Sequence, residues 1–188
     1  MIYSLQTAST LDIVTLESVR TALQLPSNDT SSDELIKEYI KTAVAYIEEK
    51  TNRVLGTSTW KGYEDYFKEL QTINKNPVTA ISSITYYDSD GNEQTVSSSD
   101  YYTDIASEPA RVYIENGPTS LFTRPNAVTY NFTAGYTDAD NVPPQAKTAI
   151  RMLCRHYYDN RGVASPVQLY EVPMGVTSLI NQLRIDEL

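Results

Sequence analysis

The feature that most constrains this chain is a strand followed at once by a sharp turn and a long helix, between residues 127 and 162. Val128, Tyr130 and Phe132 alternate with polar residues, which is the period of a strand that buries one face. Gly135 follows this run and permits a tight bend of the backbone. The fold must therefore bury one face of a strand and turn the chain away directly after it.

A helix is predicted to begin after that turn. Pro143 and Pro144 suit the first turn of a helix, where a missing N–H group is not needed. Gly162 stands just after the expected last turn as a stop signal. Apolar side chains recur between these points at helical spacing: Ala146, Ala149, Ile150, Leu153 and Tyr157. The pattern predicts an amphipathic helix with one buried face.

Three further helices are predicted from periodicity and from start signals. A short helix covers residues 16–23. Ser31 and Glu34 have the spacing of a capping box, which predicts the start of a strong helix that ends between residues 52 and 56. A last helix is expected over residues 177–184. All four helices lie outside the middle third of the chain.

The segment from 57 to 142 has no helical period and is rich in tyrosine, threonine, serine and valine. Asp90-Gly91 is a hairpin signal between two of its expected strands. The predicted strands cover residues 59–66, 80–88, 93–96, 101–104, 111–114 and 127–134.

These patterns predict an α+β fold, in which a small helical core of about four helices carries an antiparallel β insertion between the second and third helices. Residues 1–14 have no clear period and are expected to form an N-terminal arm. The predicted parts are 1–14 as the arm, 15–56 as the N-terminal core helices, 57–142 as the β insertion and 143–188 as the C-terminal core helices.

Charge excludes several classes of function. The chain carries a formal net charge of −9, and residues 57–142 hold five basic and twelve acidic side chains, a net −7. A nucleic-acid-binding protein needs a positive surface, so specific DNA binding is not expected. No apolar run approaches the length of a membrane span, and we expect no membrane partner. A single cysteine excludes an intrachain disulfide framework.

Catalytic, metal-binding and cofactor sites are not predicted. Cys154 and His156 are the only cysteine and histidine, and two positions on a helix place their side chains about 200° apart, out of hydrogen-bond reach. Asp88 to Glu93 resembles a calcium loop in composition but is half the length of an EF-hand loop. We interpret that run as a hairpin turn, and expect no metal and no cofactor.

One basic stripe is a candidate docking site. Lys147, Arg151 and Arg155 follow one another at four-residue spacing on the helix that begins near Pro144. Three interpretations stay open: a solvated face, a docking stripe for an acidic partner, or direct contact with DNA. The fifteen tyrosines are likewise open to two main interpretations, an interface between subunits or an ordinary sheet surface.

Several motifs, taken in order, resemble the head-tail connector (tail adaptor) proteins of tailed bacteriophages. The resemblance covers most of residues 15–184. The segments that carry it are Ala45-Tyr46-Ile47-Glu48 with Asn52-Arg53, the strand ending Phe132-Thr133-Ala134-Gly135-Tyr136, Val142-Pro143-Pro144, the helix ending Tyr157-Tyr158-Asp159-Asn160-Arg161-Gly162, and Val172 to Val176.

The resemblance implies a non-enzymatic structural subunit of the virion neck, assembled in the cytoplasm of the bacterial host. Its implied partners are the portal protein, neighbouring copies in a ring of roughly twelvefold symmetry, and tail or neck proteins, with DNA passing through the channel without specific binding. The alternatives are another neck or tail component, such as a head-completion or tail-terminator protein, and a small hydrolase that relies on carboxylates. The residues alone support an acidic, tyrosine-rich assembly protein.

Overall fold

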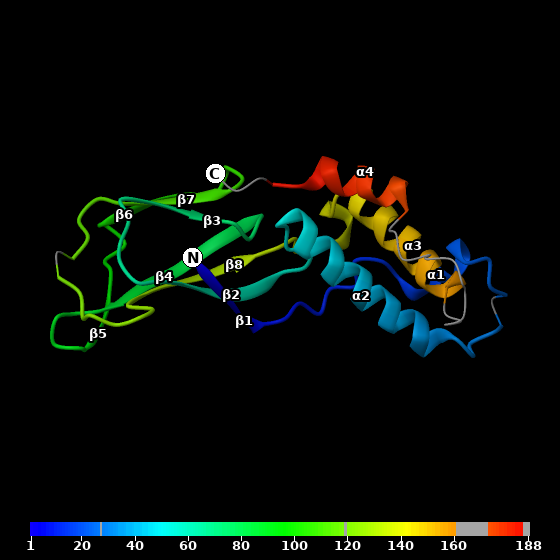
Figure 1. The fold of residues 1–188 in the computed structure, drawn as a ribbon, viewed down its shortest axis with the longest axis horizontal. Helices are drawn as coiled ribbons and strands as arrows, with labels where there is room; N and C mark the ends of the chain where they lie inside the picture. The colour runs from blue at the N-terminus through cyan, green and yellow to red at the C-terminus, as the bar shows by residue number, and fades with distance from the viewer. Residues whose placement is uncertain (27, 119, 161–172, 186–188) are drawn as a thin grey trace. The chain divides into compact units, whose positions relative to one another are not determined.

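The computed structural model describes residues 1–26, 28–118, 120–160 and 173–185 (Figure 1). They form two compact units, which we describe separately. The helical unit is built from Leu11–Leu55 and Asp138–Arg184, and the β unit from Met1–Thr10, Gly56–Thr137 and Ile185. Helices and antiparallel sheets together confirm the predicted α+β class.

Helix α3 is the centre of the helical unit, because it packs against each of the other three helices. Its buried side chains include Ala149, Ile150 and Leu153, as the apolar spacing predicts, and α2, which packs against it, buries Ile36 and Ile47. The helical elements are α1 (Leu16–Ala22), α2 (Asp33–Thr51), the 3-10 turn η1 (Ala139–Asn141), α3 (Pro144–Asp159) and α4 (Met174–Leu183).

The predicted capping box at the start of α2 is wrong. Ser31 donates its hydroxyl to the Asp29 carboxylate over 2.6 Å, and Glu34 pairs with Lys37 at 2.6 Å. Both members of the box are therefore engaged elsewhere, and Ser32 stands at the N-cap without a side-chain hydrogen bond. The hydrogen bonds from Ser31 also hold the pKa of Asp29 below its ordinary value.

The ends of α2 and α4 are joined by one side chain. Asn52 closes α2 in the left-handed conformation, and Arg53 then donates from Nε to the carbonyl of Leu183 over 2.7 Å. This bond satisfies a carbonyl in the last turn of α4, which has no partner within the helix. Helix α4 begins at Met174, three residues earlier than predicted. The stop signal at Gly162 lies outside the described residues.

Two antiparallel sheets make up the β unit. The larger has the strand order β1-β2-β8-β4-β5, and the smaller has the order β3-β7-β6. The strands are β1 (Ile2–Thr7), β2 (Ser58–Glu64), β3 (Leu70–Ile73), β4 (Val78–Tyr87), β5 (Glu93–Thr95), β6 (Tyr101–Asp104), β7 (Ala110–Ile114) and β8 (Val128–Ala134).

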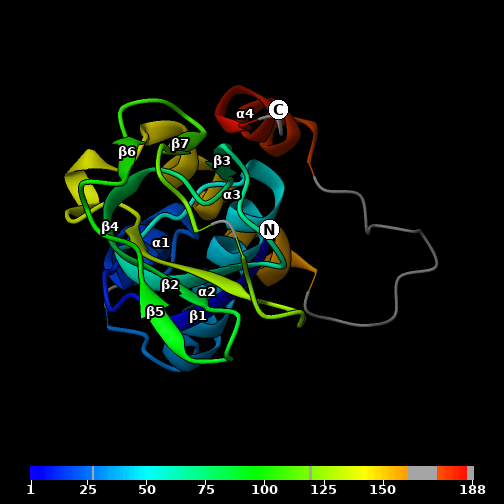
Figure 2. The ribbon, with the colours of Figure 1, turned by 90° about the vertical axis from the view of Figure 1, so that its left-hand side faces the viewer.

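The two sheets pack face to face with the core between them. Figures 1 and 2 both show β3, β6 and β7 on one side of the five-stranded sheet. Tyr130 and Phe132 of β8 and Val112 of β7 point inward and are fully buried. The hydroxyl of Tyr3 accepts a hydrogen bond from the Asn74 N–H over 2.7 Å, which ties β1 to the chain beyond β3. Each sheet therefore keeps one outer face.

The interpretation of the first 14 residues as an arm is corrected. Residues 2–7 form β1, an edge strand that pairs with β2 from Ile2↔Tyr63 to Thr7↔Thr59. Within it, Tyr3 packs edge-to-face on Phe132, with ring centroids 6.1 Å apart. The local sequence shows a weak period because the strand is bulged between Leu5 and Thr7. Strand β3 is missed for a different reason: it exposes Leu70 and buries Gln71, so its sequence lacks the apolar alternation of a half-buried strand.

Gly135 provides a test of the turn after β8. Its φ is +104°, and an added Cβ would collide with the carbonyl oxygen of Gly56. Gly91, in the β4–β5 hairpin, also has a positive φ (+83°), but a Cβ there would meet only the ring of Phe122 at 3.5 Å. We expect Gly135→Ala to destabilise the protein by about 2–4 kcal/mol and Gly91→Ala by about 1 kcal/mol, measured by urea denaturation. Equal losses would contradict this account of the turn.

Candidate docking surfaces

The predicted basic stripe on α3 is formed, but Arg155 is engaged within the subunit. Its guanidinium donates to the carbonyl of Ala22, the last residue of α1, over 3.3 Å. It also pairs with Asp159 one turn further along α3, at 3.4 Å. Arg155 therefore helps to close the end of α1, where a cation is favoured by the helix dipole.

Lys147 and Arg151 are the part of the stripe that can meet a partner. Both are half-buried on α3, beside the apolar residues that face the helical core. Arg151 makes one long hydrogen bond, 3.4 Å, to the hydroxyl of Thr148. Among the ion pairs between described residues, none involves either side chain. Among the described residues, two cations at four-residue spacing are thus left outside any ion pair.

The Cys154 and His156 side chains are not brought together. Cys154 is fully buried, and burial raises the pKa of its thiol to about 12. A thiol in that state is a poor nucleophile. His156 instead lies beside Asn160, whose side-chain amide donates to the His156 carbonyl over 2.7 Å. The pair therefore has no geometry for catalysis.

The acidic run from Asp88 to Glu93 forms the β4–β5 hairpin turn, as predicted. Oδ1 of Asp88 accepts from the N–H groups of Asp90 and Asn92, at 3.0 and 2.9 Å. These hydrogen bonds hold the pKa of Asp88 below its ordinary value. Across the described part of the chain, no cluster of histidine, cysteine and acidic side chains is arranged to hold a metal ion.

The outer face of the three-stranded sheet carries a row of large exposed side chains. Leu70 of β3 lies opposite Tyr113 of β7, which lies opposite Tyr102 of β6. Their exposures are 51%, 39% and 59%, and the two tyrosine rings stack with centroids 6.4 Å apart. We call Leu70, Tyr102 and Tyr113 the aromatic face.

Charged residues on both sides of the aromatic face leave it acidic. On one side Arg111 is neutralised by Asp104 at 2.6 Å, and hydrogen bonds from Ser107 together with Arg111 lower the pKa of Asp104 to about 2. On the other side Glu115 interacts with the hydroxyl of Tyr102, which raises the pKa of that tyrosine, and no ion pair between described residues involves Glu115. A partner with positive charge would complement this surface.

The outer face of the five-stranded sheet has a different chemistry. Its central rows, set by the register of β8 with β2 and β4, are almost entirely neutral, and Asn131 donates to the hydroxyl of Ser83 over 3.0 Å. We call these residues the hydroxyl face: Thr59, Lys61, Tyr63, Ser83, Thr85, Tyr87, Thr129, Asn131 and Thr133.

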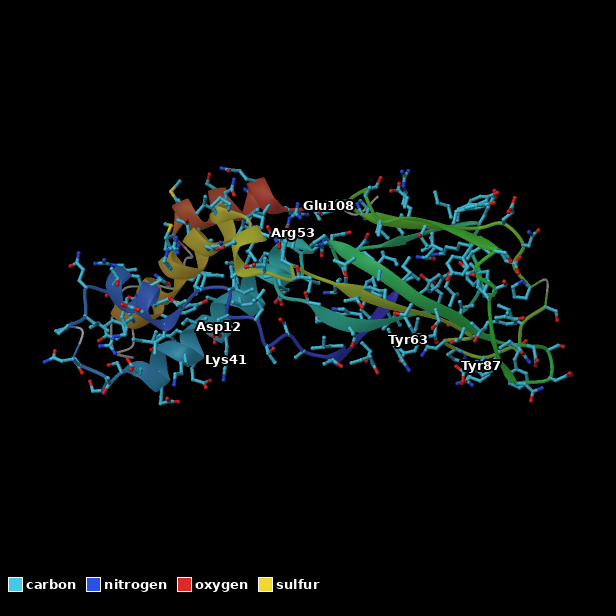
Figure 3. The ribbon with its side chains drawn as sticks, turned by 180° about the vertical axis from the view of Figure 1, so that it is seen from behind. Asp12, Lys41, Arg53, Tyr63, Tyr87 and Glu108 are labelled. Carbon is cyan, nitrogen blue, oxygen red and sulfur yellow. The ribbon has the colours of Figure 1, made fainter. Side chains whose placement is uncertain are left out.

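The charges on the hydroxyl face are mainly basic. Lys61 lies in a central row, and the guanidinium of Arg124 stacks on the ring of Tyr87, 4.2 Å from its centroid. The acidic Glu93 lies only at the margin, on the edge strand β5. Figure 3 shows Tyr63 and Tyr87 at one side of the β unit and Glu108, in the β6–β7 connection, at the other.

A shallow pocket of about 480 Å³ lies among the loops at one end of the β unit. Its lining contains one carboxylate, Asp65, which accepts from the N–H of Asn126 over 2.8 Å. Hydrolysis by carboxylates alone commonly needs a pair of them, one acting as acid and one as base or nucleophile. This pocket therefore does not provide the machinery of the hydrolase alternative.

The surfaces described above are suited to assembly, and sequence comparison assigns the family. A sequence profile of the phage gp6-like head-tail connector proteins matches residues 13–116, more than half of the chain. The chain belongs to this family. The predicted resemblance is confirmed, and the protein is a structural head-tail connector component.

Solved structures share the fold of the connector over its whole length. It is 22% identical to a chain from the neck of an empty GTA particle computed with C6 symmetry, with a TM-score of 0.76, covering 100% of this chain and 97% of that one. It is 23% identical to a chain from the virion of a native gene transfer agent (GTA) particle, with a TM-score of 0.75 and the same coverage. No curated protein matches the sequence.

A third match supports the same fold. A chain from the neck of a native GTA particle computed with C12 symmetry is 21% identical to the connector, with a TM-score of 0.73, covering 100% of this chain and 97% of that chain. Within the described residues, no helix of the connector is long and apolar enough to cross a bilayer.

The aromatic face could not be located from the sequence. Tyr102 and Tyr113 lie on predicted strands, but their alignment depends on a sheet register that sequence does not show. Leu70 belongs to the missed strand β3. The only signal available was alternation in β7, where Arg111 and Tyr113 stand between buried apolar residues.

Stability measurements should separate the members of the basic stripe. Arg155→Ala removes the contact with Ala22 and the pair with Asp159, so we expect a loss of about 0.5–1 kcal/mol in unfolding free energy. Lys147→Ala, one turn from the start of the same helix, should change it by less than about 0.5 kcal/mol. Chemical denaturation of both variants tests the difference. A larger loss for Lys147→Ala would show that the stripe is assigned wrongly.

Proposed function

We propose that this connector is a subunit of a homo-oligomeric ring that lies beneath the portal, extends the DNA channel and receives the tail. The observation that carries the proposal is the family match over residues 13–116. In this proposal the subunit belongs to the virion neck and assembles in the cytoplasm of the bacterial host. Its partners are the portal protein, copies of itself, and tail or neck proteins.

The symmetry of related particles supports a ring. Two of the structures that share this fold are necks computed with C6 and C12 symmetry. A closed ring needs heterologous contacts, in which each copy offers two different surfaces to its neighbours. Twelve copies, in line with the C12 particle, is the number that we propose here.

The charge of the β section suits a channel through which DNA passes. Residues 57–142 carry five basic and twelve acidic side chains, a net −7. Such a surface repels phosphates, and passing duplex DNA would therefore not be retained by it. DNA is thus proposed to move through the ring without specific binding.

Docking to the portal is assigned to the helical unit. Lys147 and Arg151 are two cations beside the helical core, and the wider chain is acidic. Pairs of this kind at the rim of an interface mainly steer and orient association. Arg155 also contacts the end of α1, and we therefore propose Lys147 and Arg151 as the main docking residues.

The proposed role requires no catalysis. The connector family is structural, and Cys154 is buried away from His156. A different neck or tail component, such as a head-completion or tail-terminator protein, is the competing role. It would place the subunit at another level of the neck, and a labelled subunit in tailed particles would reveal that position.

Charge reversal tests the docking assignment. Lys147→Glu combined with Arg151→Glu should leave the subunit folded but reduce tail attachment, because like charges would then face an acidic partner. The readout is the number of DNA-filled heads without tails in a complementation assay, and the defect should weaken at high salt.

The matched control reverses two other lysines. Lys37→Glu with Lys41→Glu makes the same change in net charge on the exposed side of α2, where both lysines pair within their own helix. It should attach tails at the normal level. Normal attachment by the α3 variant would instead identify the stripe as a solvated face, and an equal defect in both variants would indicate a general effect of charge.

A further inference from the structure

The β unit presents two outer faces on opposite sides, because its two sheets pack with their inner faces together. A subunit in a closed ring must likewise meet one neighbour with one surface and the other neighbour with a different surface. The aromatic face and the hydroxyl face therefore have the placement that a ring contact needs. Their chemistry decides whether they also fit each other.

The aromatic face has the composition that is typical of the centre of a protein interface. Leu70, Tyr113 and Tyr102 form one continuous row across three strands, and each is exposed by 39% or more. Tyrosine is enriched at the centres of protein interfaces because its ring is apolar and its hydroxyl can hydrogen-bond. Exposed side chains of this size, gathered in one row, mark an interaction surface rather than an ordinary sheet exterior.

The hydroxyl face complements this row in shape and in bonding. Its central rows on β2, β8 and β4 consist mainly of threonine, serine and asparagine, and Thr129 and Thr85 follow Tyr63 across the sheet. Short hydroxyl side chains leave room for tyrosine rings and offer donors and acceptors to their hydroxyl groups. Tyr63 on β2 and Tyr87 on β4 themselves add apolar area on either side of β8.

Charge favours the same pairing. Glu115 interacts with Tyr102 of the aromatic face, while Arg111 is neutralised by Asp104. The hydroxyl face holds Lys61 in a central row and Arg124 over Tyr87. Within an acidic chain, one face is therefore negative and the opposite face locally positive, which suits contact between copies.

We propose that the aromatic face of one copy packs on the hydroxyl face of the next copy, so that the β units follow one another front to back around the ring. The occupant of each face is thus a second copy of this chain. The inference rests on the proposed ring. It adds the surfaces by which the ring closes.

Cysteine cross-linking tests the front-to-back contact. We would introduce Tyr102→Cys in the aromatic face and Thr129→Cys in the hydroxyl face, and treat assembled rings with a bismaleimide of flexible length. The native Cys154 is fully buried, so it should contribute little background. The double variant should form a ladder of cross-linked copies. Each single variant should stay uncross-linked, because a heterologous contact does not bring identical positions together.

The alternatives give different bands. Dimers from a single variant would show a symmetric contact between like faces and overturn the proposal. Intact rings of the double variant without any ladder would show that another surface closes the ring, or that a different protein covers these faces. Asp90→Cys in the β4–β5 turn, outside both faces, is the matched control and should not cross-link.

Exchange of charges provides an independent test. Glu115→Lys and Lys61→Glu should each lower the association constant between copies by about tenfold, because each places like charges across the contact. The double variant should recover to within about threefold of the wild type. Additive losses would overturn the pairing of these faces. If the wild-type chain itself forms no ring, alone or on heads, then the proposed function fails and this inference fails with it.

Discussion

The position of β8 at the centre of the five-stranded sheet is the constraint on which the β unit depends. This strand pairs on one side with β2 and on the other with β4. Its alternation sends Val128, Tyr130 and Phe132 into the core between the sheets, and therefore sends Thr129, Asn131 and Thr133 outward. The same pattern of residues thus closes the core and makes the hydroxyl face.

The role of an assembly protein rests on such contact surfaces and does not require a catalytic centre. Helix α3 likewise has a different role on each side. Ala149, Ile150 and Leu153 are buried in the helical core, and Arg155 contacts α1. Lys147 and Arg151 are the residues proposed to meet a partner. In the proposed assembly, both units therefore use one side of a central element for stability and the other for contact. Surfaces kept for contact are what a member of the structural head-tail connector family needs.

The sequence predicted those parts of the fold in which periodicity runs over several turns or alternations. Strand β8, the prolines at the start of α3 and the hairpin at Gly91 all have strong local signals, and the structure has them at nearly the expected residues. It could not predict β1, because a bulge interrupts its short alternation, or β3, because that strand exposes Leu70 and buries Gln71. Nor could it predict that the Ser31 hydroxyl would donate to the Asp29 carboxylate instead of capping α2. The alignment of Leu70, Tyr102 and Tyr113 across three strands was equally out of reach. The alignment of the three strands depends on tertiary pairing, whereas the Ser31–Asp29 bond is a local competitor of the cap, two residues away along the chain.

The central claim is that many copies of this chain form a ring in the neck of the particle. The most direct measurement is an electron cryo-microscopy reconstruction of the neck, into which the two units are fitted separately. We expect a closed ring of identical subunits next to the portal, with the aromatic face of each copy against the hydroxyl face of the next. A neck without this chain, or one that holds single copies with no contact between them, would contradict the account.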